Sequence, residues 1–175
     1  GRGVLNDQLL QNLMELSKAN NVLTIVDPKL TRLSATSGAN IVLFERRGLE
    51  LLAKRREITN LNDLTQQLIQ ENDWEAILEL RENDGITWHT MDQEPSIIIG
   101  SVNKPLQYLG LHDAASAALA LSHLLKLNED EKLILANAAS ELMFTATKGR
   151  DLVIDKRKLG DRVHERAWNM RISQR

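Results

Sequence analysis

The sequence contains no cysteine, only 3% aromatic residues and no long apolar run, and each absence excludes a class of protein. Without cysteine there is no disulfide scaffold, no thiolate zinc site and no cysteine nucleophile. Few aromatic side chains leave little surface on which single-stranded nucleic acid can stack its bases. No segment approaches the roughly 20 apolar residues of a membrane-spanning helix, and the N-terminus lacks the apolar core of a signal peptide. We therefore expect a soluble, cytoplasmic protein with no membrane partner.

The length and composition are those of a single globular domain. The chain has 175 residues, of which 42% are hydrophobic and 26% charged. This usage disfavours intrinsic disorder, collagen-like structure and a coiled-coil rod. A single hydrophobic core can still form at this length, so we do not expect two independent domains.

The charge is unevenly distributed along the chain. Residues 155–175 carry seven Lys/Arg against three Asp/Glu, a net charge of +4, and because the whole chain carries −2 the preceding residues carry −6. An acidic body argues against a nucleic-acid-binding domain. The basic segment has two interpretations: it contacts nucleic acid or acidic lipid, or it is an ordinary helix that docks onto the body or a partner. We favour docking and do not expect a nucleic-acid partner.

Apolar periodicity predicts helices that alternate with short strands. Leucine and isoleucine recur at steps of three and four in the helices, while short β-branched runs between turn residues mark the strands. The predicted helices are 7–19, 49–53, 61–69, 113–125, 129–145 and 155–172. The predicted strands are 22–26, 40–44, 75–80, 85–89 and 96–99. This alternation favours a layered α/β fold with a largely parallel sheet flanked by helices.

The segment Leu109–Ala115 is a glycine-containing turn that leads into a helix of small residues. Backbone N–H groups at such a helix start can hold an anion, and a carboxylate there can accept a proton from an attacking hydroxyl. Asp113 therefore has two interpretations, the N-cap of the helix or a general base. The Walker phosphate loop, the nucleophile elbow and the dinucleotide fingerprint are absent. The four histidines are scattered, so no metal site is predicted from them.

Four short motifs follow one another along the chain: Arg2–Leu5, Ile25–Lys29, Gly110–Asp113 and Leu135–Ala139. Their order resembles the C-terminal half of the ribokinase-like (PfkB) carbohydrate kinases, and most of all the heptose-7-phosphate kinases. The resemblance implies a partial, three-layer ribokinase-like fold. In that division residues 1–159 form the nucleotide-side half of the domain, and residues 160–175 form a basic C-terminal helix or tail.

The resemblance also implies an activity, which is ATP-dependent phosphoryl transfer to a hydroxyl of a sugar or sugar phosphate, with ATP and Mg²⁺ as cofactors. The implied site consists of the catalytic base Asp113, the anion hole Gly110, Leu111 and His112, the phosphate or metal region Asp27, Lys29 and Glu45, and the nucleotide-binding residues Arg81, Gly85 and Asn137. The N-terminal half of the kinase fold must then come from the same or another chain, and we expect a homo- or hetero-oligomer.

The chain departs from the family pattern at three places. Glu45 and Gly48 stand where the family has the Asn and Glu that organise magnesium and phosphate. Leu80 replaces a nucleotide-contacting Thr, and His112 replaces the second glycine of the anion hole. Glycine serves where the backbone must approach a ligand closely, so a side chain at position 112 changes that approach. The alternative function is therefore a pseudokinase that acts as a scaffold, oligomerisation or regulatory domain.

Overall fold

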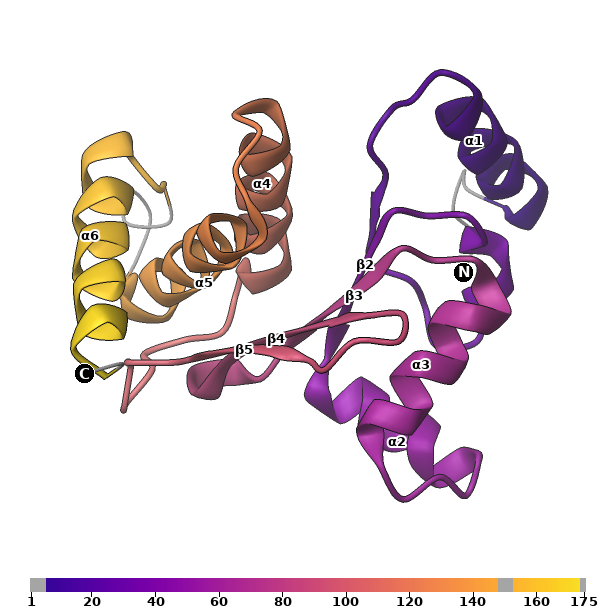
Figure 1. Ribbon diagram of the computed structural model, residues 1–175, viewed down its shortest axis with the longest axis horizontal. Coiled ribbons are helices and arrows are strands. Elements are labelled where there is room, and N and C mark those ends of the chain that lie inside the picture. Colours follow the sequence, from indigo (N-terminus) through magenta and orange to yellow (C-terminus); the bar gives the residue numbers. More distant parts are fainter. Residues whose placement is uncertain (1–5, 148–152, 174–175) are drawn as a thin grey trace. The chain divides into compact units, whose positions relative to one another are not determined.

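The computed structural model describes residues 6–147 and 153–173 (Figure 1). The Arg2–Leu5 motif lies outside the described residues. Within the two described ranges, no helix is both long enough and apolar enough to cross a membrane.

Helices and short strands alternate along the chain, as the periodicity predicts. The helices are α1 (Asp7–Ala19), α2 (Arg46–Arg55), α3 (Leu61–Asn72), α4 (Leu111–Leu124), α5 (Glu129–Thr145) and α6 (Lys156–Ser173). The strands are β1 (Ile25–Val26), β2 (Ile41–Glu45), β3 (Ala76–Leu80), β4 (Gly85–Thr90) and β5 (Ser96–Ile99), with short 3₁₀ helices at η1 (Leu33–Thr36) and η2 (Glu82–Asp84). The predicted α/β class is confirmed.

The strands form one five-stranded sheet in the order β1-β2-β3-β4-β5. The first three strands run parallel, with Val26 opposite Val42 and Leu43 opposite Leu78. The connections before β4 and β5 are four and five residues long. Parallel strands need a crossover of a dozen or more residues, so these two connections are antiparallel hairpins. The sheet therefore combines a parallel part, β1 to β3, with two antiparallel hairpin connections.

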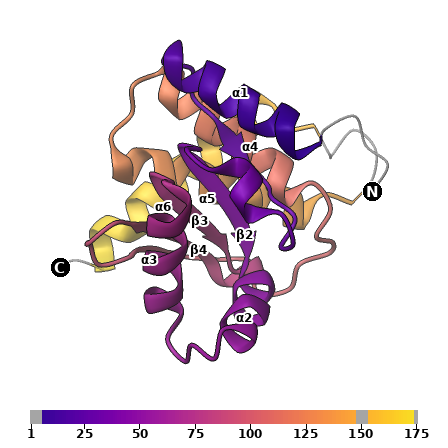
Figure 2. The same cartoon turned by 90° about the vertical axis from the view of Figure 1, so that its right-hand side faces the viewer.

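The chain divides into two compact units, residues 6–80 with 87–96 and residues 81–86 with 97–147 and 153–173. In the first unit, α1, α2 and α3 lie on the same side of β2 and β3 (Figure 1). Figure 2 shows α1 toward the amino end of β2 and α2 at its carboxyl end. The core between these helices and strands includes Val42, Phe44, Leu49, Leu64, Leu68, Trp74 and Ile77.

The second unit is built around three helices. α5 packs against both α4 and α6 and lies between them (Figure 1). Both α4 and α5 bury small residues, which let helix backbones approach closely: Ala114, Ala115, Ala118, Ala136 and Ala139. α5 starts with a capping box, in which Asn128 and Glu131 each bond the backbone N–H of the other, so its first turn is fixed locally.

Most element boundaries agree with the prediction. α1, α5 and β5 have the predicted bounds, and α6 is shifted by one residue at each end. The first strand is the main difference, because β1 covers only Ile25–Val26 of the predicted 22–26 and Val22 is exposed. β1 is the edge of the sheet and pairs with β2 on one side alone. Strand propensity depends on packing against neighbouring strands, and an edge strand has a neighbour on one side only.

Candidate functional site

The N-terminal end of α4 carries the predicted anion hole and catalytic base. Gly110 is the N-cap, with φ of +75°, a left-handed conformation that glycine adopts at little cost. The chain therefore enters the helix at Leu111, two residues earlier than predicted, and the N–H of Ala114 donates to the carbonyl of Gly110 at 2.9 Å. Asp113 is the third residue of the helix, and its interpretation as the N-cap is wrong.

The side chains in the first turn of α4 differ in their exposure to solvent. Leu111 is buried, His112 is half-buried and Asp113 is exposed. The first N–H groups of an α-helix lie outside its hydrogen-bond ladder and carry the positive end of the helix dipole. This end of α4 can therefore attract an anion within one turn of an exposed carboxylate.

An open cavity of about 400 Å³ lies at this end of α4. It is lined by residues of the turn before α4, the first turn of α4, α5 and the segment before α6: Leu109, Gly110, Asp113, Ala114, Met143 and Ile154. Asp113 is the one charged residue in that set, and the others are apolar or glycine. Ligand sites of proteins have such volumes and combine apolar walls with a few polar groups. The structure thus brings the predicted base and the first anion-hole glycine to one cavity.

The turn between β3 and β4 contains two predicted nucleotide-binding residues. The backbone N–H of Arg81 donates to the carbonyl of Gly85 at 2.9 Å, and Nη2 of Arg81 donates to the carbonyl of Asp84 at 3.0 Å. Gly85 has φ of +101°, and a Cβ added to it would lie 2.0 Å from the carbonyl oxygen of Ile98. The close approach of β4 and β5 therefore requires glycine at position 85, whether or not a nucleotide binds nearby.

Asn137, the third predicted nucleotide-binding residue, is buried and belongs to a polar group around a buried carboxylate, which we call the Glu141 cluster: Ser101, Asn137, Glu141, Arg162 and Arg166. Oε1 of Glu141 accepts from the backbone N–H of Ser101 (2.8 Å), its hydroxyl (3.0 Å) and Nδ2 of Asn137 (3.1 Å). Arg166 Nη2 lies 3.3 Å from Oε1, and Arg162 Nε lies 3.3 Å from Oε2. The basic helix α6 therefore docks onto α5 through a buried carboxylate.

The carboxyl end of the parallel strands carries the predicted phosphate or metal region in the first unit. Asp27 and Lys29 follow β1, Glu45 ends β2, and all three side chains are exposed. Because β1 and β2 are adjacent and parallel, these residues share one edge of the sheet. Ligands of open α/β sheets bind at the carboxyl ends of the strands. The predicted site residues thus fall into two groups. Asp27, Lys29 and Glu45 belong to the first unit, and the other predicted residues belong to the second.

Two functional candidates escaped the sequence reasoning, namely the buried carboxylates Glu79 and Glu141. Glu79 is 2% exposed on β3, and Glu141 is 1% exposed on α5. Each has a signal in the sequence, since Glu79 interrupts an apolar strand and Glu141 falls at a core position of a helix. A charged residue at a core position is almost never left without a partner. The partners themselves come from distant segments, so the sequence did not identify them.

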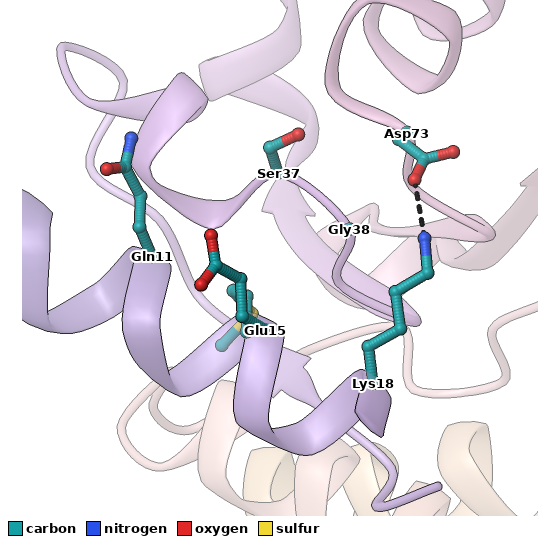
Figure 3. A pocket seen from close by; sticks show the side chains of 7 residues that line it. Gln11, Glu15, Lys18, Ser37, Gly38 and Asp73 are labelled. Atoms are coloured by element: carbon teal, nitrogen blue, oxygen red, sulfur yellow. Dashed lines mark hydrogen bonds and ion pairs between the residues drawn. The ribbon is translucent and has the colours of Figure 1, made fainter. Parts of the chain in front are cut away.

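A second cavity, also of about 400 Å³, lies in the first unit toward the amino end of β2 (Figure 3). Its lining residues come from α1, the turn before β2 and the turn before β3: Gln11, Met14, Glu15, Lys18, Ser37, Gly38 and Asp73. Nζ of Lys18 and Oδ2 of Asp73 form an ion pair of 3.0 Å across it (Figure 3). None of the predicted site residues lines this cavity.

Comparison with known proteins places this geometry in context. No protein-family model matches the chain. The bifunctional protein HldE of Aliivibrio fischeri is 27% identical over 132 residues, which are 75% of this chain and 28% of that protein. The chain therefore spans less than a third of that relative.

Solved structures of sugar kinases share the fold. Phosphofructokinase-2 from Escherichia coli, in complex with substrates and products, superposes with a TM-score of 0.74 and 15% identity over 94% of this chain and 54% of that one. Ribokinase from Arabidopsis thaliana, complexed with ribose and ATP, superposes with a TM-score of 0.73 and 17% identity, over 90% of this chain and 53% of that one. Ribokinase from Thermotoga maritima superposes with a TM-score of 0.71 and 12% identity, over 92% of this chain and 60% of that one. The chain thus has a ribokinase-like fold, spans just over half the length of these kinases, and bears out the resemblance to the PfkB kinases that its motifs indicate.

Proposed function

We propose that this chain forms the nucleotide-side, C-terminal half of a PfkB-type sugar kinase-like protein, which transfers a phosphoryl group from ATP to a hydroxyl of a sugar or sugar phosphate. One observation carries the proposal. Asp113 and Gly110 line the same cavity at the N-terminal end of α4, in a fold shared with a ribokinase whose structure holds ribose and ATP.

In the proposed reaction Asp113 accepts the proton of the sugar hydroxyl while the hydroxyl oxygen attacks the γ-phosphorus of ATP. The new O–P bond forms as the bond from the γ-phosphorus to the oxygen of ADP breaks. The products are the sugar phosphate, ADP and the proton on Asp113. Backbone N–H groups of Gly110, Leu111 and His112 stabilise the negative charge on the transferred group.

Mg²⁺ is held in proteins by one or two carboxylates together with substrate phosphates and water, and it neutralises phosphate charge during transfer. Asp27 and Glu45 fit this donor set, because they are exposed carboxylates after adjacent parallel strands. Lys29 adds a cation for the phosphates. We assign Arg81, Gly85 and Asn137 to the nucleotide side, where their contacts with Asp84, Ile98 and Glu141 would hold them in place.

A pseudokinase that serves as a scaffold, oligomerisation or regulatory domain is the second candidate. It is favoured by the environment of Leu80, which is 1% exposed at the end of β3. The family has a hydroxyl at this position, whereas here an apolar side chain belongs to the core. His112 also favours the pseudokinase, because its half-buried imidazole in the first turn of α4 stands where the family has the second glycine of the anion hole.

The partner that we propose is the remaining half of the kinase fold, from the same or another chain. Two features of the first unit support it. β1 is an edge strand, and edges of sheets are ordinarily paired or covered. α1 exposes Leu9, Leu13 and Leu16, at helical steps of four and three, with 37%, 39% and 61% of each residue accessible. A further strand beside β1 would pair the edge and cover part of this apolar stripe.

Calorimetric titration of ATP and ADP, with and without Mg²⁺, tests the proposed function on the chain alone and in its natural protein context. Magnesium-dependent binding at micromolar nucleotide supports the kinase and justifies a screen of sugars and sugar phosphates. No binding at millimolar nucleotide in either context contradicts the kinase and favours the pseudokinase.

Asp113→Asn distinguishes catalysis from binding. We expect turnover to fall by about 10²–10⁴-fold, because the general base is lost, while nucleotide affinity changes little. Asp130→Asn is the matched control, since Asp130 is an exposed carboxylate in the first turn of α5. Unchanged turnover in Asp113→Asn would remove this residue from the mechanism.

A further inference from the structure

Glu79 is the last but one residue of β3, a strand in which every residue is buried. Burial of an ionised carboxylate is costly unless the charge is paired and hydrogen-bonded. A residue retained at this cost needs an explanation beyond packing. The hydrogen-bond and ion-pair partners of Glu79 supply that explanation.

Three elements of the first unit converge on Glu79. Oε1 lies 3.1 Å from Nη1 of Arg46 on α2, and Oε2 lies 3.1 Å from Nε2 of His89 on β4. Nδ1 of His89 lies 3.2 Å from Oγ1 of Thr65 on α3. His89 is 3% exposed and Thr65 is fully buried. We call Arg46, Thr65, Glu79 and His89 the Glu79 network.

Hydrogen-bond accounting places protons on both sides of the imidazole. The hydroxyl of Thr65 donates to the carbonyl of Asn62 at 2.9 Å, so its oxygen is an acceptor for the N–H at Nδ1 of His89. An ionised carboxylate only accepts hydrogen bonds, whereas a protonated one can donate. The contact between Nε2 of His89 and Oε2 of Glu79 therefore holds one proton, whichever of the two atoms carries it.

Arg46 links this buried pair to the predicted phosphate or metal region. It is the first residue of α2 and directly follows Glu45 at the carboxyl end of β2. Its guanidinium is 47% exposed and also contacts Glu50 at 3.2 Å. The network thus includes the guanidinium of Arg46 on α2, where Glu50 also contacts it, and the ring of His89 on β4, with the Thr65 hydroxyl on α3.

We propose that Glu79 and His89 are positioning residues, which share one proton and, through Arg46, fix the junction between β2 and α2. The buried end of the network is rigid because β3 and β4 carry it, whereas Arg46 is half in solvent. The junction that carries Glu45 is therefore held from inside the fold. The positioning itself is independent of the proposed function, and only its effect on nucleotide binding rests on that function.

Nitrogen NMR of His89 at neutral pH tests the proton assigned to Nδ1. We expect a protonated Nδ1 in the wild-type chain, and we expect its signal to shift in Glu79→Gln, where an amide replaces the carboxylate. An unprotonated Nδ1 would mean that Thr65 donates to the ring, and this result would overturn the proton assignment.

Hydrogen exchange tests the positioning. The amides of Leu49 and Glu50 close the first turn of α2, and we expect them to exchange about tenfold faster in Glu79→Gln and in Arg46→Gln. The second variant removes a half-exposed side chain, so it keeps the test valid if Glu79→Gln does not fold. Glu50→Gln is the matched control, because it removes the solvent-side partner of Arg46, and its rates should stay within about twofold.

Equal exchange in Arg46→Gln, Glu50→Gln and wild type would overturn the positioning role. Nucleotide titration separates this result from the proposed function. If the wild-type chain in its natural context binds magnesium nucleotide, Arg46→Gln should weaken binding while Glu50→Gln should not. If the wild type binds no nucleotide but exchange still accelerates in Arg46→Gln, the positioning stands and the kinase proposal fails.

Discussion

Among the residues that the structure describes, each unit buries one glutamate, and the two are neutralised by different means. Glu79, in the first unit, pairs with a half-exposed arginine and a buried histidine. Glu141, in the second unit, pairs with two arginines of α6 and also accepts from the backbone and side chain of Ser101. Arginine stays charged at any pH a protein experiences, whereas histidine changes its charge near neutrality.

The difference teaches what each carboxylate does in the fold. The Glu141 cluster joins α5 to α6, and its two arginine side chains are 22% and 11% exposed. It is a permanent attachment of α6. The Glu79 network is anchored in the sheet and ends in solvent at Arg46. It fixes the junction between β2 and α2.

The largest effect is expected for Glu141→Gln. It leaves two arginines beside an uncharged amide, and removal of one partner of a buried ion pair costs about 3–5 kcal/mol. Urea unfolding followed by circular dichroism measures the change. Glu165→Gln is the control, because Glu165 also pairs with Arg162, at 2.9 Å, but is 65% exposed. Equal losses in the two variants would contradict the buried attachment of α6.

A smaller loss is expected for Glu79→Gln, about 2 kcal/mol, because water already screens half of Arg46 and the amide can still accept from it. The same urea titration measures it. A loss as large as that of Glu141→Gln would show that the two carboxylates are equally dependent on charge, and the comparison would then fail.

Ser101→Ala separates the hydroxyl from the backbone within the Glu141 cluster. The variant removes a hydrogen bond of 3.0 Å and keeps the one of 2.8 Å from the backbone N–H. We expect a loss of about 1 kcal/mol in the free energy of unfolding, the usual net value of one hydrogen bond. An unchanged free energy would mean that water replaces the hydroxyl at no cost.

The smallest effect is expected for the ion pair between Lys18 and Asp73, whose side chains are 69% and 74% exposed. Lys18→Gln should lower the free energy of unfolding by less than about 0.5 kcal/mol. The difference should disappear at about 1 M salt, where the Debye length is about 3 Å. Persistence of the difference in high salt would indicate a contact other than charge.

The sequence predicts the local features of the fold better than its long-range pairings. Periodicity and capping are properties of neighbouring residues, so the bounds of α1 and α5 agree with the prediction. The bounds of α4 do not, because Asp113 is a good N-cap in general but Gly110 turns the chain into the helix earlier. A backbone conformation thus outweighed a side-chain preference.

The two buried carboxylates lie beyond what such patterns contain. Arg46 precedes Glu79 by 33 residues, and Ser101 precedes Glu141 by 40. The sequence analysis predicts docking of the basic helix, whereas its anchor on α5 depends on how α5 and α6 pack. The roles of the site residues stay predictions, since Asp27, Lys29 and Glu45 belong to one unit and Asp113 to the other.

The wall of the α4 cavity opposite Gly110 is made by the end of a methionine. A Cβ at position 110 would meet Cε of Met143 at 2.9 Å, so this side chain limits the space above the turn. Methionine has three rotatable bonds and adapts to irregular shapes. That side of the cavity is therefore compliant, and it selects ligands poorly by size. The one charged side chain among the lining residues is the carboxylate of Asp113, so a hydrogen-bond donor on the ligand, such as a hydroxyl, is what this cavity can recognise.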